Sequence, residues 1–319
     1  MSFLDLPSTP LGRVLLLTAL LLPWNPAAAL GFDVRIGDIE GALWSAEGVE
    51  LEVSLSGANR TALRLTAARM VLPEPVGELR DIEIHCPQAR LGGASIDCPQ
   101  GTGHVHHPLL DSRPFPLSFA YDPGEGLSFA YEKLGFAGGQ VDGRAQWTAS
   151  GWRATLDGRQ LQLQRLAALT GKFIETDLAA GGPLTFDAEL NGDGQGLRTI
   201  RGTASSAALD FSNPASTRVG QGLAAVLRFD TRRTDDVWRL EAELQLDQGE
   251  IYLQPWYIAV ADRPLNLDAT AQWATQTNTL TVDSLHFEQP GVTRFAASAH
   301  LPLDAGIEAA AFEIDIIHA

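Results

Sequence analysis

The sequence predicts a mainly β protein, an elongated and twisted antiparallel meander with at most one or two short helices. Three observations predict it. Apolar and polar residues alternate with a period of two in most segments after residue 32. Gly, Pro, Asp and Asn punctuate these segments at the spacing of hairpin turns. A helical period of 3.6 is nearly absent after the N-terminal segment.

The alternation is clearest in five segments, at residues 49–55, 184–190, 238–246, 265–273 and 312–316. Strict alternation is typical of a strand with one buried face and one face in water. The lengths of the alternating runs predict strands of five to seven residues. Each strand therefore has an apolar face that something must cover.

The connections between these segments are short and rich in turn formers, as at residues 122–126 and 191–194. Four strands follow one another at residues 119–156, which indicates a meander. Residues 165–170 are the best helix candidate after the N-terminal segment. Residues 219–227 are a weaker one, because two glycines there favour a strand or a loop.

Residues 1–30 are typical of a targeting segment. Arg13 precedes an apolar run at residues 14–24, and a small-residue Ala-Ala-Ala pattern follows at 27–29. A bilayer-spanning helix needs roughly 20 apolar residues, so the run favours a cleaved signal peptide. An uncleaved membrane anchor is the alternative, and in both cases residues 31–319 are expected outside the cytoplasm.

Residues 31–319 are expected to form one elongated β region. Candidate seams lie at residues 108–116 and 179–183, and neither has the composition of a linker. The final residues still alternate, so the β region is expected to continue beyond residue 319 in a longer protein.

The net charge of the 319-residue chain is −16, and 45% of its residues are hydrophobic. This composition excludes a disordered chain. Nucleic acid is not an expected partner, because phosphate binding needs clustered Lys and Arg. Negative charge also disfavours adsorption to anionic lipid headgroups, so any lipid contact is expected through apolar side chains.

The two cysteines, Cys86 and Cys98, are each followed by Pro-Gln, and a Leu-Gly-Gly turn signal at residues 91–93 lies between them. Two strands joined by that turn would bring the cysteines together. In an oxidising compartment a disulfide is then expected. Two half-buried thiols are the alternative.

The motifs of catalysis are missing from the sequence. His104, His106 and His107 form a cluster without the Cys or acidic partners of a metal site, and an exposed edge or loop explains it better. Asp235 and Asp236 are typical of a solvated face and not of an acid/base pair. No nucleophile elbow, phosphate loop or zinc-protease motif occurs. We therefore expect no enzyme, no cofactor and no metal.

Helices are too few to cover the apolar strand faces, which leaves a second sheet or an apolar ligand as the cover. Taken alone, the residues favour the sandwich, a structural or scaffolding β protein that binds envelope proteins. If the cover is a ligand, the side chains that would line the groove are Leu51, Val53, Phe129, Tyr131, Trp147, Leu240, Leu244, Leu267 and Trp273.

Several stretches resemble the AsmA-like superfamily of Gram-negative envelope proteins, and within it the YdbH family. They are the Gly-Ala-Leu and Gly-Val-Glu-Leu pieces of residues 41–51, the segment 79–87 with its partner Cys98, residues 209–238, and residues 249–292. The likeness covers most of the chain.

The resemblance implies a periplasmic β structure tethered to the inner membrane, with a long sheet curled into an open apolar groove. Members of the family are thought to pass phospholipids between the inner and outer membranes, with acyl chains in the groove. This favours a lipid over a second sheet as the cover. The chain departs from the family in a shorter membrane segment and in the absence of the C-terminal half.

Overall fold

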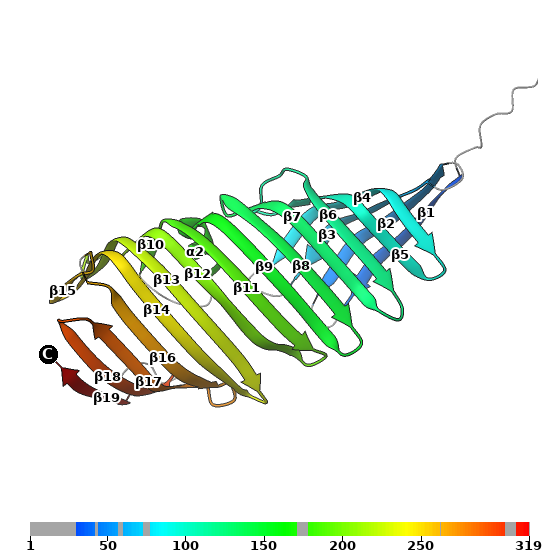
Figure 1. Ribbon diagram of the computed structural model, residues 1–319. Coiled ribbons are helices and arrows are strands. Elements are labelled where there is room, and N and C mark those ends of the chain that lie inside the picture. Colours follow the sequence, from blue (N-terminus) through cyan, green and yellow to red (C-terminus); the bar gives the residue numbers. More distant parts are fainter. Residues whose placement is uncertain are drawn as a thin grey trace, which may run out of the picture.

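A computed structural model describes residues 30–41, 44–56, 60–72, 77–170, 178–261, 263–303 and 311–318. These residues form one antiparallel sheet of 19 strands and one short helix (Figure 1). The predicted signal peptide or anchor at residues 1–30 lies, except for its last residue, outside the described residues. No helix of the described part is long and apolar enough to cross a membrane.

The N-terminal half is a run of nine strands joined by hairpins. Their bounds are β1 Leu30–Glu40, β2 Ser45–Ser56, β3 Arg60–Val71, β4 Glu78–Gly92, β5 Ser95–His106, β6 Phe115–Asp122, β7 Gly126–Phe136, β8 Gly139–Thr148 and β9 Gly151–Gln162.

The C-terminal half begins with the helix. The bounds are α2 Leu163–Thr170, β10 Ala179–Gly181, β11 Pro183–Asp193, β12 Gly196–Ser212, β13 Arg218–Thr234, β14 Val237–Leu253, β15 Trp256–Ala259, β16 Leu265–Ala274, β17 Thr279–Gln289, β18 Thr293–Pro302 and β19 Ala311–His318.

Nearly every strand pairs with the next one along the chain, as in a meander. The short strands β10 and β15 are the exceptions. They add to the ends of β12 and β14, so that β9 pairs with β11 and β14 pairs with β16. Strands β1 and β19 each have one pairing partner, and the sheet is open. The predicted antiparallel meander is confirmed.

The prediction of five- to seven-residue strands was wrong, because the strands of the main ladder are 8 to 17 residues long. Register shifts interrupt the alternation while the strand continues. One of them, between Gln221 and Ala225, lies inside β13. Residues 219–227, the weaker helix candidate, lie in β13, in agreement with the strand that their two glycines favoured. The bulge interrupts the alternation within this segment.

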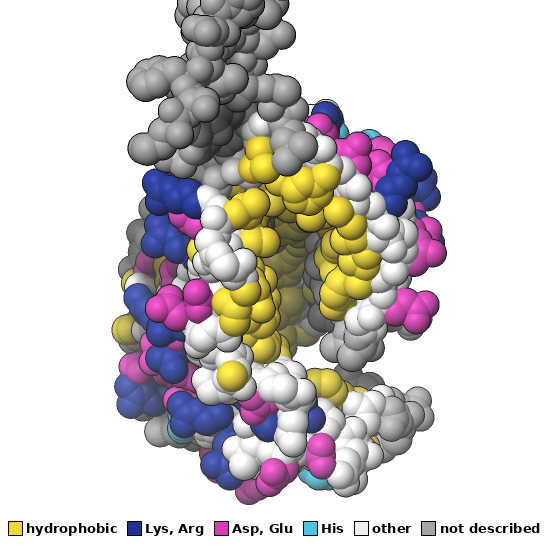
Figure 2. Space-filling model, turned by 90° about the vertical axis from the view of Figure 1, so that its right-hand side faces the viewer, with side chains coloured by type: hydrophobic (Ala, Val, Ile, Leu, Met, Phe, Trp, Pro, Cys, Tyr) yellow, Lys and Arg dark blue, Asp and Glu magenta, His cyan; other side chains and the backbone are white. Residues whose placement is uncertain are grey.

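The sheet is curved, and Figure 2 looks at it from the end that carries β1. Hydrophobic side chains gather on the inner side, around a hollow, and most charged side chains lie on the outer side. A sandwich, which the residues alone favoured, needs two sheets. The described residues form one.

The helix α2 covers the residues for which a short helix was predicted. The candidate seam at 108–116 falls on the connection between β5 and β6 and on the start of β6, whereas the seam at 179–183 falls on β10 and the start of β11. Both segments are hydrogen-bonded to the sheet, as the bond from Asp111 N–H to the Gly135 carbonyl shows (2.9 Å).

Candidate functional site

The candidate site is the apolar face of the sheet, which we define as the side chains on the same side as Val53, Phe129 and Leu244. Residues directly opposite one another in an antiparallel pair point to the same side, so the register traces this face from strand to strand. One row of such neighbours, joined at β4 and β5 by the cysteine pair, contains only one polar residue, Thr231. It runs through Phe32, Val53, Leu63, Cys86, Cys98, Phe119, Phe129, Ala145, Ala154, Leu190, Ile200, Thr231, Leu240, Ala271, Val282 and Ala299.

The opposite side, the charged face, carries ion pairs between neighbouring strands. Arg35 and Glu50 are directly opposite and approach to 3.1 Å between Nε and Oε1. The Asn191 amide and the Arg153 guanidinium both donate to Glu189, and they hold the pKa of its carboxyl below the usual value. Exposed pairs of this kind add little stability, but they make this face one that stays in water.

All nine residues predicted to line a groove lie on the apolar face, by the register. Val53 is buried at 3% exposure, whereas Trp147 and Trp273 are exposed at 44% and 40%. The other six are half-buried. No second layer of described residues covers them, so large apolar side chains in the middle of the sheet keep part of their surface free.

Aromatic rings of the apolar face lie over glycines of the neighbouring strand. A Cβ atom added to Gly143 would stand 2.4 Å from Cζ of Tyr131, its direct partner in the register. A Cβ on Gly158 would stand 2.3 Å from Cε1 of Phe186. Rings that rest on bare glycine backbone lie along the sheet, and they leave the space above the apolar face free.

The same arrangement recurs along the sheet. Three more glycines have an aromatic residue as their direct partner in the register, and a Cβ atom added to each of them would stand 2.5 Å or less from the ring. The pairs are Gly103 with Phe115, Gly192 with Trp152, and Gly220 with Phe211. The sequence did not reveal these pairs. A glycine and an aromatic residue become partners only through the register, and the register depends on the exact turns and bulges.

Tyr131 is an ionisable residue on the apolar face. Burial raises the pKa of its phenol above the usual value, and the nearby Asp142 carboxylate adds to the effect. Its ring lies 6.0 Å from the Phe129 ring and 6.3 Å from the Phe115 ring, between centroids. The phenol therefore stays neutral at ordinary pH and packs as an aromatic side chain.

Cys86 and Cys98 face each other across β4 and β5, as the turn signal between them predicted. Their Sγ atoms lie 2.12 Å apart, which is a disulfide distance, and both residues are fully buried. The register of β4 and β5 stops after His85 and resumes at Arg90. Pro87 and Pro99, which cannot donate backbone hydrogen bonds, lie in this interruption. The cysteine pair therefore links the two strands where their backbone pairing is interrupted.

The histidine cluster lies at the end of β5. His107 Nδ1 accepts a hydrogen bond from the Leu109 N–H at 3.2 Å, and His104 and His106 are opposite Glu83 and Arg80. Among the described residues, no group of three or more His, Cys, Asp or Glu side chains is placed to hold a metal ion.

A depression of about 830 Å³ lies on the charged face across β7 to β14. Charged side chains line it, among them Asp142, Arg159, Arg228 and Glu243, and these four form ion pairs with one another or with neighbours. Its charged lining distinguishes it from the apolar face.

Fold and site define a class: a single elongated antiparallel sheet with one continuous apolar face and one charged face. Comparison of the chain with protein-family models, with curated proteins and with solved structures gives no match. The functional argument therefore rests on the chemistry of the two faces.

Proposed function

We propose that the apolar face forms an open groove that binds the acyl chains of phospholipids and lets them move along the sheet. The chain is then a non-enzymatic lipid-conducting protein of the Gram-negative envelope, with its sheet in the periplasm. It passes phospholipids between the inner and outer membranes, and the N-terminal segment tethers it to the inner membrane where that segment is retained.

The observation that carries the proposal is the row from Phe32 in β1 to Ala299 in β18, which is apolar except for Thr231. The Thr231 hydroxyl donates a hydrogen bond to the Ile200 carbonyl at 3.2 Å, so its polar group is satisfied within the sheet. A packed core needs clusters of buried side chains, but it does not need one apolar path through every strand. A path for a diffusing acyl chain does need it, because each polar interruption would cost desolvation.

Two further features support a mobile ligand as the cover. The apolar residues of the mid-sheet are half-buried, so apolar surface is left for a ligand to remove from water at roughly 25 cal/mol per Å². The charged face keeps the opposite side in water. The resemblance of residues 41–51 and 79–98 to AsmA-like proteins points to the same function.

Neighbouring residues on opposite faces of β14 provide the test. Leu244 lies on the apolar face opposite Leu267, and Glu243 lies on the charged face opposite Asp268. A photoreactive residue at position 244 is expected to crosslink phospholipid in the bacterial envelope, and the same residue at 243 is not. Equal labelling at the two positions would reject the groove.

A charge in the groove should stop transfer without unfolding the sheet. We expect Leu244→Glu to reduce the amount of phospholipid that co-purifies with the protein and to reduce lipid transfer between vesicles at least tenfold. The reason is that burial of a carboxylate among acyl chains costs several kcal/mol. Gln245→Glu adds the same charge one residue away on the charged face and should leave transfer unchanged. Lipid mass spectrometry and circular dichroism measure both effects.

A further inference from the structure

The two long margins of the sheet, where the strands turn, differ in construction. One margin has, among the described residues, tight turns at residues 93–94, 123–125, 149–150, 194–195, 235–236 and 275–278. We call it the tryptophan rim. The opposite margin carries the long connections, including α2 with β10 and the β14–β15 extension, and we call it the covered rim.

Amphipathic aromatic residues gather on the apolar face at the tryptophan rim. Trp147 is directly opposite Trp152, and Trp238 is directly opposite Trp273. Tyr121 belongs to the same margin, one residue before the turn that begins at Asp122. Tyr121, Trp147 and Trp273 are exposed, and Trp152 and Trp238 are half-buried.

The polar atoms of this margin are directed to its turns. The Trp273 indole N–H donates a hydrogen bond to Oδ1 of Asn278, at 3.2 Å, in the turn that follows β16. Arg233 is directly opposite Trp238 and thus places a cation on the apolar face at the same margin. It is bonded to the turn through the Asp235 carbonyl at 2.8 Å and Asp236 at 3.7 Å.

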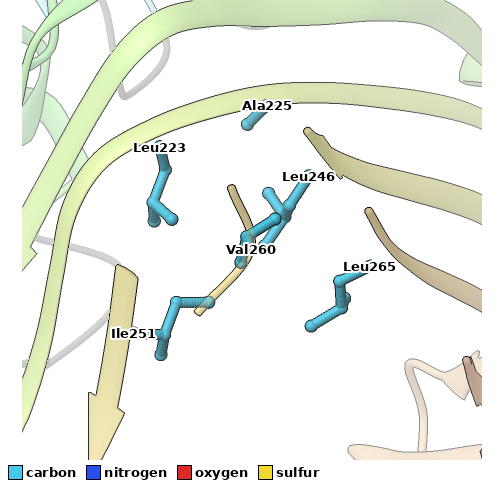
Figure 3. Close-up of a cluster of buried hydrophobic side chains, with 6 residues drawn as sticks. All are labelled: Leu223, Ala225, Leu246, Ile251, Val260 and Leu265. Atoms are coloured by element: carbon cyan, nitrogen blue, oxygen red, sulfur yellow. The ribbon is translucent and has the colours of Figure 1, made fainter. Parts of the chain in front are cut away.

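On the strands of the main ladder, the covered rim has phenylalanine in place of tryptophan. Two tryptophans of the described residues lie at this margin outside those strands, Trp44 directly before β2 and Trp256 on β15. Phe186, Phe211 and Phe287 lie on the apolar face near this margin. The long connections fold back over it. Val260, which follows β15, is fully buried and donates its N–H to the Gly249 carbonyl at 2.9 Å. Figure 3 shows Val260 packed among Leu223, Leu246, Ile251 and Leu265.

We infer that bound phospholipids lie in one orientation across the strands, with the headgroup and glycerol at the tryptophan rim and the acyl-chain ends toward the covered rim. The inference rests on the proposed function and adds which margin is the mouth of the groove. Trp and Tyr combine an apolar ring with a hydrogen-bond donor and favour sites where hydrocarbon meets water. Phe has no donor and suits the hydrocarbon side.

The test uses the full-length protein and two photoreactive phosphatidylethanolamines, one with the diazirine in the headgroup and one with it at the acyl terminus. Labelled peptides are mapped by mass spectrometry. The headgroup probe is expected to label the segments around Trp147 and Trp273, and the acyl-terminal probe those around Phe186 and Phe287. The reverse distribution, or equal labelling of both margins by both probes, would overturn the orientation and leave the groove standing. Absence of labelling with either probe would reject the proposed function itself.

Substitutions separate the donor from the ring. Trp147→Phe with Trp273→Phe keeps apolar bulk and removes two N–H groups, of which that of Trp273 is already bonded to Asn278. We expect lipid affinity to fall by about 2- to 13-fold, the usual net value of one hydrogen bond. Trp256→Phe is the matched control, because Trp256 is 71% exposed on β15, at the covered rim. Equal losses in the two variants, or no loss in the double variant, would contradict a headgroup role for the tryptophan rim.

Discussion

At the scale of single residues, the pairing of Tyr131 with Gly143 decides how much room the apolar face has. We predict that Gly143→Ala lowers the free energy of unfolding by about 1–3 kcal/mol, because the new methyl group meets the Tyr131 ring at 2.4 Å. The ring must then turn away from the sheet, which narrows the proposed groove. Chemical unfolding and lipid co-purification measure the two consequences.

Gly194→Ala is the control for this prediction. Gly194 lies in the turn between β11 and β12, and a Cβ atom there would meet nothing within 4 Å. Its substitution should change stability and lipid content little. Equal stability of Gly143→Ala and Gly194→Ala would show that the Tyr131 ring does not depend on the glycine beneath it.

Within a stretch of strand that has no bulge, the side of the sheet that each residue faces could be predicted from the sequence. Alternation alone places Leu240 and Leu244 together and Glu243 opposite. Which residues touch could not. Phe186 and Gly158 are distant in sequence and become neighbours only because the ladder passes from β9 to β11 around α2. The same holds for Trp238 and Trp273, whose meeting forms part of the tryptophan rim.

At the scale of elements, the cysteine pair replaces part of the ladder between β4 and β5. We predict that Cys86→Ala with Cys98→Ala destabilises these strands by about 3 kcal/mol, the chain-entropy value for so short a loop. Hydrogen exchange should rise in β3 to β6 and stay unchanged in β13 to β16. Unchanged exchange in β4 and β5 would mean that packing on Leu63 and Phe119 suffices to hold them together.

The strands themselves were predicted as alternating segments, but their ends were not. In β12 the register shifts between Ser206 and Leu209 and again before Phe211, and in β13 between Gln221 and Ala225. The shift after Ser206 moves the apolar residues of β12 from even positions, such as Ala204, to odd positions, such as Leu209 and Phe211, while they stay on the same face. A period of two cannot be followed through such bulges, so the alternation predicted strands shorter than those of the sheet.

At the scale of the whole molecule, the alternation of apolar and polar residues could not predict whether the strands form one sheet or two. A sandwich and a curved single sheet have the same period, and they differ in the length of the strands and in the order of pairing. The consecutive pairing from β1 to β9, and then through β11 to β19, rules out a division of the described strands into two facing sheets. Most strands therefore depend on two neighbours and on whatever fills the hollow.

This one-dimensional order predicts graded stability. In repeat-like structures each unit is stabilised mainly by its nearest neighbours, so β1 and β19, with one neighbour each, should exchange their amide hydrogens first. The long strands β12, β13 and β14 should exchange last, because they share the longest ladders. Hydrogen exchange followed by mass spectrometry measures the gradient along the chain. Uniform protection from β1 to β19, lost in a single cooperative step, would contradict nearest-neighbour stabilisation. It would mean that a distant contact or a bound ligand couples the two ends of the sheet.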